Sequence, residues 1–101
     1  MTKYGLLGQL KAQEGKVKVL ADILIKASKI VSEAPGCFLY IVGFEGNTVI
    51  LQEVWETKKE HDDSLNMPGV RELIGEAIPL LDGPPVKGQE LEILGGHGLN
   101  F

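Results

Sequence analysis

The stretch that decides the fold is EVWETKKEHDDSLNMPGV, which covers residues 53–70. It starts as the end of a strand that reaches Trp55, the only tryptophan of the chain. Thr57 is followed three residues later by Glu60, which is the spacing of a capping box. We therefore expect the Thr57 hydroxyl to accept a hydrogen bond from the Glu60 N–H, and a short helix to begin at Lys58.

A second helix is predicted shortly after the first. Pro68 has no N–H and a fixed φ, which suits the first turn of a helix, and Asn66 is a candidate N-cap for it. A strand end, a helix start and a proline break thus follow one another within this stretch. This order predicts that Glu53, Trp55 and His61 lie in one neighbourhood.

The remaining chain supplies the elements around that neighbourhood. Alternation predicts strands over residues 3–12, 37–44, 48–56 and 86–94, and helical spacing of apolar residues predicts helices over residues 14–34 and 70–81. The order β-α-β-β-α-β indicates a ferredoxin-like α+β fold with a four-stranded antiparallel sheet. We expect one domain over residues 1–101, with an ordered core over 3–94 and a glycine-rich tail over 95–101 that carries His97.

Two of the predicted strands are apolar on both faces. In residues 37–44, for example, Cys37 and Ile41 lie on one face, and Phe38 and Tyr40 lie on the other. The two helices can cover only one face of the sheet, and no further segment remains for the other. A second copy of the sheet would cover it, so the sequence predicts a homodimer.

Composition and charge exclude several classes of partner. The formal net charge of −4 argues against nucleic acid and anionic membranes, which bind basic patches. No apolar run approaches the ~20 residues of a membrane-spanning helix, and no signal peptide is evident. The single cysteine, Cys37, cannot form an internal disulfide, so we expect a reducing, cytoplasmic location.

Several short motifs together resemble one family. They are Glu53-Val54-Trp55-Glu56, Glu60-His61-Asp62, Leu65 and Pro68, together with Pro35-Gly36-Cys37, Tyr40, Leu80-Leu81 and Gly83-Pro84. In order and spacing they resemble the antibiotic biosynthesis monooxygenases, which are small proteins of the dimeric α+β barrel superfamily. The resemblance covers about residues 3–94 and implies two sheets packed into a barrel. Ser64 and Gly69 depart from it, because many members have histidines at these two positions.

The resemblance implies a pocket between the sheet and the helices. In that pocket Trp55 would be the wall, His61 the proton acceptor and Glu53 the group that orients His61. Further substrate-binding candidates come from the strands and helices around it: Tyr40, Gly8, Leu51, Leu65 and Arg71.

Each of these candidates also has a structural reading. Trp55 and Tyr40 suit a core, and His61 suits a half-buried hydrogen bond. Glu53 lies among apolar residues of its strand, so it needs a partner, for which Arg71 and His61 are candidates. A glycine inside a strand, such as Gly8, makes room either for a ligand or for a helix side chain.

The leading functional prediction is a cofactor-independent monooxygenase that oxidises an aromatic or quinol-like molecule with O2. Two alternatives stay open. One is an isomerase of a small hydroxy-ketone phosphate, with Lys58, Lys59 and Arg71 as candidate cations. The other is a non-catalytic, dimeric module that binds a small ligand. No metal or cofactor is expected, because neither the histidines nor Cys37 have metal-site spacing and no phosphate-binding glycine loop is present.

Overall fold

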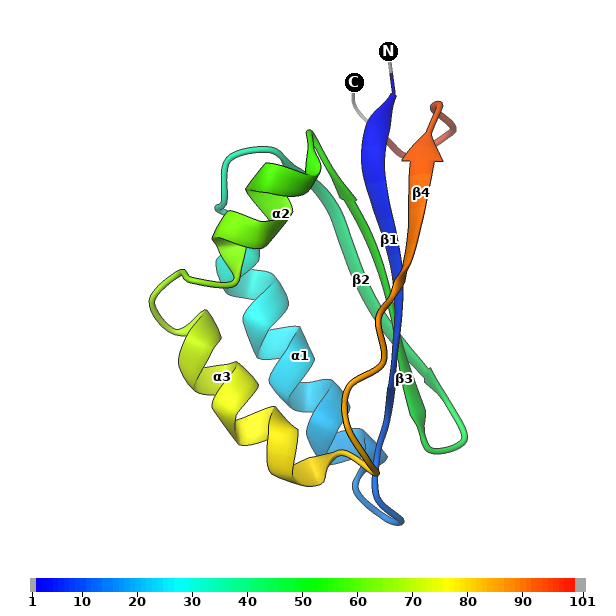
Figure 1. Cartoon of the computed structure of the whole chain (residues 1–101), viewed down its shortest axis with the longest axis vertical. Helices are drawn as coiled ribbons and strands as arrows, with labels where there is room; N and C mark the ends of the chain where they lie inside the picture. Colours follow the sequence, from blue (N-terminus) through cyan, green and yellow to red (C-terminus); the bar gives the residue numbers. More distant parts are fainter. Residues whose placement is uncertain (1, 100–101) are drawn as a thin grey trace.

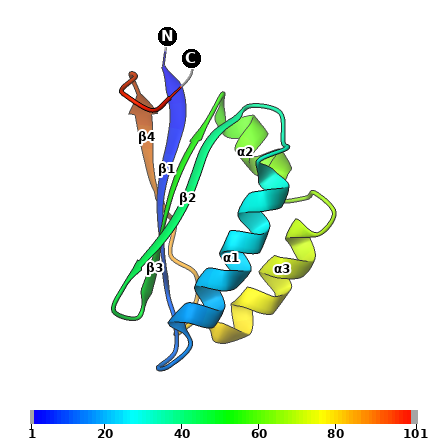
Figure 2. The same ribbon diagram turned by 180° about the vertical axis from the view of Figure 1, so that it is seen from behind.

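The computed structural model describes residues 2–99 and has two layers, one of strands and one of helices (Figure 1). The elements in chain order are β1 (Lys3–Lys11), α1 (Val17–Val31), β2 (Cys37–Glu45), β3 (Thr48–Trp55), α2 (Lys58–Ser64), α3 (Val70–Ala77), the single 3₁₀ turn η1 (Ile78–Leu80) and β4 (Gln89–Ile93). The strands form one antiparallel sheet in the order β2-β3-β1-β4. All helices lie on one face of this sheet, as the view from behind also shows (Figure 2). The predicted ferredoxin-like α+β fold is therefore confirmed.

The strand register decides which side chains face the helices. Tyr4 pairs with Trp55 and Leu6 pairs with Glu53 across β1 and β3, and Tyr40 of β2 pairs with Glu53 from the other side. Because side chains alternate between faces along a strand, these positions all lie on the helix-covered face. The functional candidates of β2 and β3 are thus brought to one face by strand pairing.

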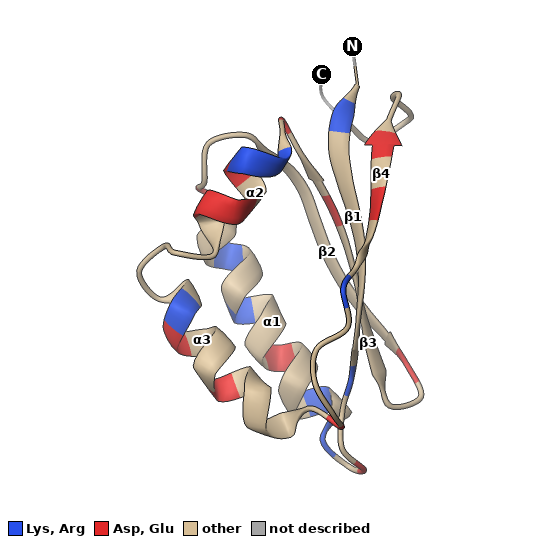
Figure 3. Ribbon diagram, viewed as in Figure 1, with Lys and Arg blue, Asp and Glu red and all other residues tan. Residues whose placement is uncertain are grey.

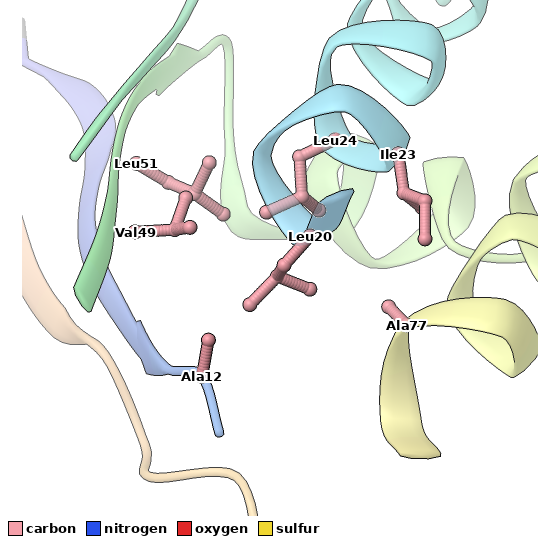
Figure 4. Packing of buried hydrophobic residues seen from close by; sticks show 7 residues of the cluster. All are labelled: Ala12, Leu20, Ile23, Leu24, Val49, Leu51 and Ala77. Carbon is pink, nitrogen blue, oxygen red and sulfur yellow. The ribbon is translucent and has the colours of Figure 1, made fainter. Parts of the chain in front are cut away.

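The core lies between α1 and the sheet. Figure 4 shows the main cluster, in which α1 contacts β3 while two alanines close the lower end; its members are Ala12, Leu20, Ile23, Leu24, Val49, Leu51 and Ala77. A second cluster around Trp55 contains Val31, Ala34 and Val70 and lies near α2. Trp55 has no exposed surface, so its ring anchors the end of β3 to the helices.

Helix and strand ends differ from the predictions in four respects. The third helix begins at Val70, as the apolar spacing predicts, but Pro68 precedes it instead of lying in its first turn, because Gly69 has a φ of 90° and separates the two. Asn66 does not cap α3; its N–H donates to the carbonyl of Asp63 in the turn that ends α2. The last strand starts at Gln89, three residues later than expected, and α1 starts at Val17.

The start of α2 is close to the prediction. Thr57 is its N-cap, but its hydroxyl oxygen accepts a hydrogen bond from the N–H of Lys59 at 3.2 Å and not from that of Glu60. The Thr57 hydroxyl itself donates to the Glu60 carboxylate. The helix therefore begins at Lys58 as expected, with a different pairing inside the cap.

The other face of the sheet is open in the single chain. Its apolar side chains are Leu7, Leu39, Ile41, Ile50, Val54, Leu91 and Ile93. Ile41 is 45% exposed and Leu91 is 40% exposed. Within residues 2–99, no helix is both long enough and apolar enough to cross a membrane.

Candidate functional site

A cavity of about 370 Å³ lies between the helices and the sheet. It exists because α3 packs mainly on α1 rather than on the sheet, so space remains above β1. Its walls are chiefly aliphatic, with contributions from Leu6, Leu24, Val31, Leu51, Ile74 and Leu81. The segment between η1 and β4 lines one side through Pro85, Val86 and Gly88.

The polar side chains of the cavity include Glu53, whose carboxyl is almost entirely buried at 6% exposure. Its Oε1 atom accepts a hydrogen bond from Nε1 of Trp55 at 2.9 Å. Burial raises the pKa of Glu53, while the hydrogen bond from Trp55 and the charge of His61 act in the opposite direction. The hydrogen bond from the Trp55 indole thus holds the buried Glu53 carboxyl in place at the edge of an apolar cavity.

His61 lies next to this carboxyl. Its Nε2 atom is 3.8 Å from Oε1 of Glu53, and its Nδ1 atom is 2.9 Å from Oδ1 of Asp62. The imidazole ring stands edge-on to the Trp55 ring, with 5.9 Å between ring centroids, and lies 5.8 Å from the Tyr4 ring. Side chains from β1, β3 and α2 therefore hold the ring on three sides.

Glu53 and His61 each have one polar atom that is not hydrogen-bonded within the described chain. Neither Oε2 of Glu53 nor Nε2 of His61 has a hydrogen-bond partner among residues 2–99. The same residues contain no side-chain nitrogen or oxygen that is both fully enclosed and unpartnered. Both atoms therefore reach accessible surface, and both residues line the cavity. A proton acceptor and a carboxyl oxygen thus stay available to a molecule bound there.

Tyr40 adds a hydroxyl to the same region. Its ring lines the cavity and also borders a second, open cleft along β2. Burial is the main cause that raises the pKa of the Tyr40 phenol, and the nearby Glu53 carboxyl adds to it. The phenol therefore stays protonated near neutral pH and can donate a hydrogen bond.

The charges around the cavity are acidic at this end. Figure 3 shows acidic positions, coloured red, on β3, β4 and α2, and the lysine positions at the start of α2 in blue. Lys58 and Lys59 pair with Asp62 and Asp63 at 2.9 Å and 2.7 Å, and all four side chains are at least half exposed. No lysine or arginine is among the described residues that line the cavity.

Comparison with solved structures decides the family. The chain is 31% identical to a protein from Chloroflexus aurantiacus J-10-fl that carries the name of the antibiotic biosynthesis monooxygenases, with 97% of this chain and 99% of that one covered and a TM-score of 0.85. The chain belongs to the antibiotic biosynthesis monooxygenase family.

Other solved structures share the fold. A protein of unknown function from Nitrosomonas europaea is 26% identical, with a TM-score of 0.78 and coverage of 95% of this chain and 93% of that one. A Caulobacter crescentus CB15 structure with the same family name is 17% identical and shares the fold, with a TM-score of 0.82 and coverage of 93% and 92%. Neither the protein-family models nor the curated protein sequences give a match.

The structure of this family member brings together most of the predicted site residues. Those that line the cavity are Tyr40, Gly8, Leu51, Leu65, Glu53 and His61. Trp55 does not line it: the expectation that it forms a pocket wall is wrong, because the ring is fully enclosed in the core and only its N–H reaches Glu53. Arg71 lies exposed on α3, outside the cavity lining, so it does not partner Glu53.

The orientation of His61 also needs correction. Glu53 was expected to orient it, but their 3.8 Å separation is too long for a hydrogen bond. Asp62, which is not among the predicted site residues, makes the short contact to the ring instead. Ser64, at one of the two positions where many members have histidine, lines the cavity and donates to the carbonyl of His61 at 2.6 Å.

Two further residues near the site were missed. The Tyr4 hydroxyl donates to Oε2 of Glu90 on β4 at 2.8 Å, and the Tyr4 ring packs beside His61. Alternation along β4 puts Glu90 and Leu91 on opposite faces of the sheet. Only the pairing of Glu90 with Leu6 shows that Glu90 is on the face covered by the helices. Within residues 2–99, no group of three or more His, Cys, Asp and Glu side chains is placed to hold a metal ion.

Proposed function

We propose that the protein is a cofactor-independent monooxygenase that oxidises a neutral hydroxyaromatic, quinol-like molecule with O2. The observation that carries this proposal is the open Nε2 of His61 beside the buried Glu53 carboxyl, at the polar end of an otherwise aliphatic cavity. Family membership supports the same reaction class. An apolar cavity with few polar groups is the usual form of a small-molecule site.

The reaction would begin with proton transfer. The substrate hydroxyl would give its proton to Nε2 of His61, and Tyr40 would donate a hydrogen bond to the resulting oxyanion. The aliphatic walls would exclude water from this electron-rich anion. The anion would then reduce O2 itself, so that no metal or flavin is required.

The atoms balance without a further reductant. The substrate is a quinol with at least one unsubstituted ring carbon, whose C–H bond is converted to a C–O bond. Oxidation of the quinol to the quinone removes two further protons and two electrons. One oxygen atom of O2 enters the ring as a carbon–oxygen bond, and the other leaves as water. The product is a hydroxyquinone, and the substrate supplies both electrons that reduce the second oxygen atom.

The alternative isomerase of a hydroxy-ketone phosphate is less well supported. A phosphate needs cations or backbone N–H groups at its binding site. The described cavity lining offers no lysine or arginine, and Lys58 and Lys59 are already paired on the outside of α2. The acidic end near Glu53 and Asp62 would repel a phosphate. Experiment must distinguish the monooxygenase from a module that binds a ligand without turnover.

Two further parts of the proposal concern the state of the protein. We propose a homodimer formed through the open sheet face, because apolar side chains cover that face and no element of the described chain packs on it. We also place the protein in the cytoplasm, where its free thiol at Cys37 would stay reduced.

Oxygen uptake tests the reaction. Purified protein should consume O2 with members of a hydroquinone panel, above the rate of the same quinols alone and of heat-inactivated protein. His61→Ala should lower the turnover rate by about 10²–10⁴, the usual contribution of a general acid–base group. His97→Ala is the matched control, because His97 lies in the tail away from the cavity lining. Saturable binding of quinols without oxygen uptake would favour the binding module instead.

A further inference from the structure

We propose that Asp62 is a positioning residue that fixes the tautomer of His61 and thereby keeps Nε2 free as the proton acceptor. Its catalytic consequence rests on the proposed function, whereas the tautomer itself is a property of the protein alone. Asp62 lies outside the cavity lining, so it would act through His61 and not on the substrate.

The contact between Asp62 and His61 has one chemical interpretation. Oδ1 of Asp62 is 2.9 Å from Nδ1 of His61, which is hydrogen-bond distance. An ionised carboxylate can only accept hydrogen bonds, so the proton of this bond must lie on Nδ1. In the neutral ring the other nitrogen, Nε2, then carries a lone pair.

The carboxylate is itself held in place. Its second oxygen, Oδ2, accepts a hydrogen bond from Nζ of Lys58 at 2.9 Å, one turn earlier on α2. The hydrogen bonds from Lys58 and, next, from His61 lower the pKa of Asp62, so it stays ionised. Lys58, Asp62 and His61 thus form a chain of hydrogen bonds that ends at Nε2, which is 3.8 Å from Glu53.

The arrangement would assist both states of the reaction. Before proton transfer, Asp62 holds the ring with Nε2 ready to accept. After transfer, the imidazolium has the Asp62 carboxylate at Nδ1 and the Glu53 carboxyl near Nε2. Without Asp62, the neutral ring would be free to place its proton on Nε2, and that tautomer cannot accept a proton from the substrate.

The neighbouring residue provides a matched control. Asp63 pairs with Lys59 in the same i,i+4 geometry, at 2.7 Å, and its side chain is similarly exposed. Among the described residues, no hydrogen bond or ion pair joins it to His61. Asp63→Ala therefore removes an equivalent helix ion pair without touching the imidazole.

Two measurements on Asp62→Ala, Asp62→Asn and Asp63→Ala test the proposal. Nitrogen NMR shifts of the neutral ring should show the Nδ1–H tautomer in wild type and Asp63→Ala, and a shift toward Nε2–H in Asp62→Ala. Asp62→Asn keeps one acceptor oxygen for Lys58 and turns its NH2 group toward Nδ1, so it should also shift the ring toward Nε2–H. Because turnover scales with the population of the competent tautomer, Asp62→Ala should lose roughly fivefold to tenfold in kcat with KM nearly unchanged.

The outcomes separate this inference from the proposed function. If folded Asp62→Ala keeps the wild-type tautomer, the positioning role is wrong, whatever the activity. An equal tautomer change in Asp63→Ala would also overturn it. If no quinol is oxidised by wild-type protein, the NMR result still decides the role of Asp62 on its own.

Discussion

At the scale of single residues, the site depends on a carboxyl that is paired on one side and open on the other. Glu53 and Trp55 are two positions apart on β3, so both side chains leave the same face and the indole N–H meets Oε1. The cost of burying this carboxyl is offset only in part, because Oε2 has no hydrogen-bond partner among residues 2–99. Oε2 is therefore the atom to which the hydroxyl of a bound molecule would donate a hydrogen bond.

Glu53 should make the stability of the protein depend on pH. Because burial raises its pKa in the folded chain, its contribution is fully present below the unfolded pKa and is lost as the pH rises through the folded pKa. Glu53→Gln removes this loss and keeps an oxygen that can accept from Trp55. Urea unfolding should therefore show the variant gaining stability relative to wild type as the pH rises above the unfolded glutamate pKa of about 4.3.

Glu56 offers the control for that measurement. Its carboxylate pairs with Lys3 at 3.0 Å and is 43% exposed, so Glu56→Gln should not gain stability as the pH rises. A stability difference between Glu53→Gln and wild type that stays constant over this range would show that the Glu53 pKa is not raised by folding.

At the scale of elements, the turn between α2 and α3 places the cavity. Gly69 has a φ of 90°, a backbone conformation that side chains with a Cβ rarely adopt. A Cβ there would also lie 2.9 Å from Cδ1 of Ile30 on α1. The glycine lets the chain turn closely over α1, so that α3 docks on α1 and leaves the space that becomes the cavity.

Gly69→Ala should therefore destabilise the protein by about 1–3 kcal/mol, the usual cost of a strained backbone conformation. Gly75→Ala is the matched substitution, because Gly75 lies exposed inside α3 with nothing within 4 Å of a new Cβ. It should instead stabilise by about 0.5–1 kcal/mol through helix propensity. Thermal unfolding of the two variants distinguishes them by sign, and a stabilising Gly69→Ala would contradict the described turn.

The sequence predicts some of the elements that form the site but not all of the residues in it. The Thr57–Glu60 spacing correctly predicted a helix start at Lys58, which puts His61 one turn beyond β3. Tyr4 and Glu90 were missed, because their place beside His61 depends on pairing between distant strands. Asp62 is not among the predicted site residues, because its contact with His61 depends on a side-chain rotamer that sequence alone does not specify. The cavity follows from how α3 docks on α1, which no local pattern encodes.

At the scale of the whole molecule, the single chain has one covered and one open sheet face (Figures 1 and 2). The open face carries apolar side chains from all four strands, including Ile41 and Leu91. Monomers rarely leave such a contiguous apolar surface in water. The predicted homodimer would bury it and leave the cavity, on the other side of the sheet, accessible.

Ile41→Lys should weaken that dimer by placing a charge in the interface. Ile25→Lys is the control, because Ile25 is exposed to a similar degree, 41% against 45%, but lies on α1 away from the open face. Sedimentation velocity at micromolar concentration should show wild type and Ile25→Lys as dimers and Ile41→Lys as a monomer. A stable wild-type monomer would contradict the predicted assembly.

The central claim is that the protein itself, without metal or flavin, directs O2 onto a quinol. The most direct test is a reaction of metal-stripped protein under ¹⁸O₂, with elemental analysis of the same sample and mass spectrometry of the product. We predict one ¹⁸O atom in each hydroxyquinone and the other in water, at a rate that metal removal does not change. An unlabelled quinone formed together with hydrogen peroxide, or activity that returns only on adding a metal or a flavin, would contradict the account.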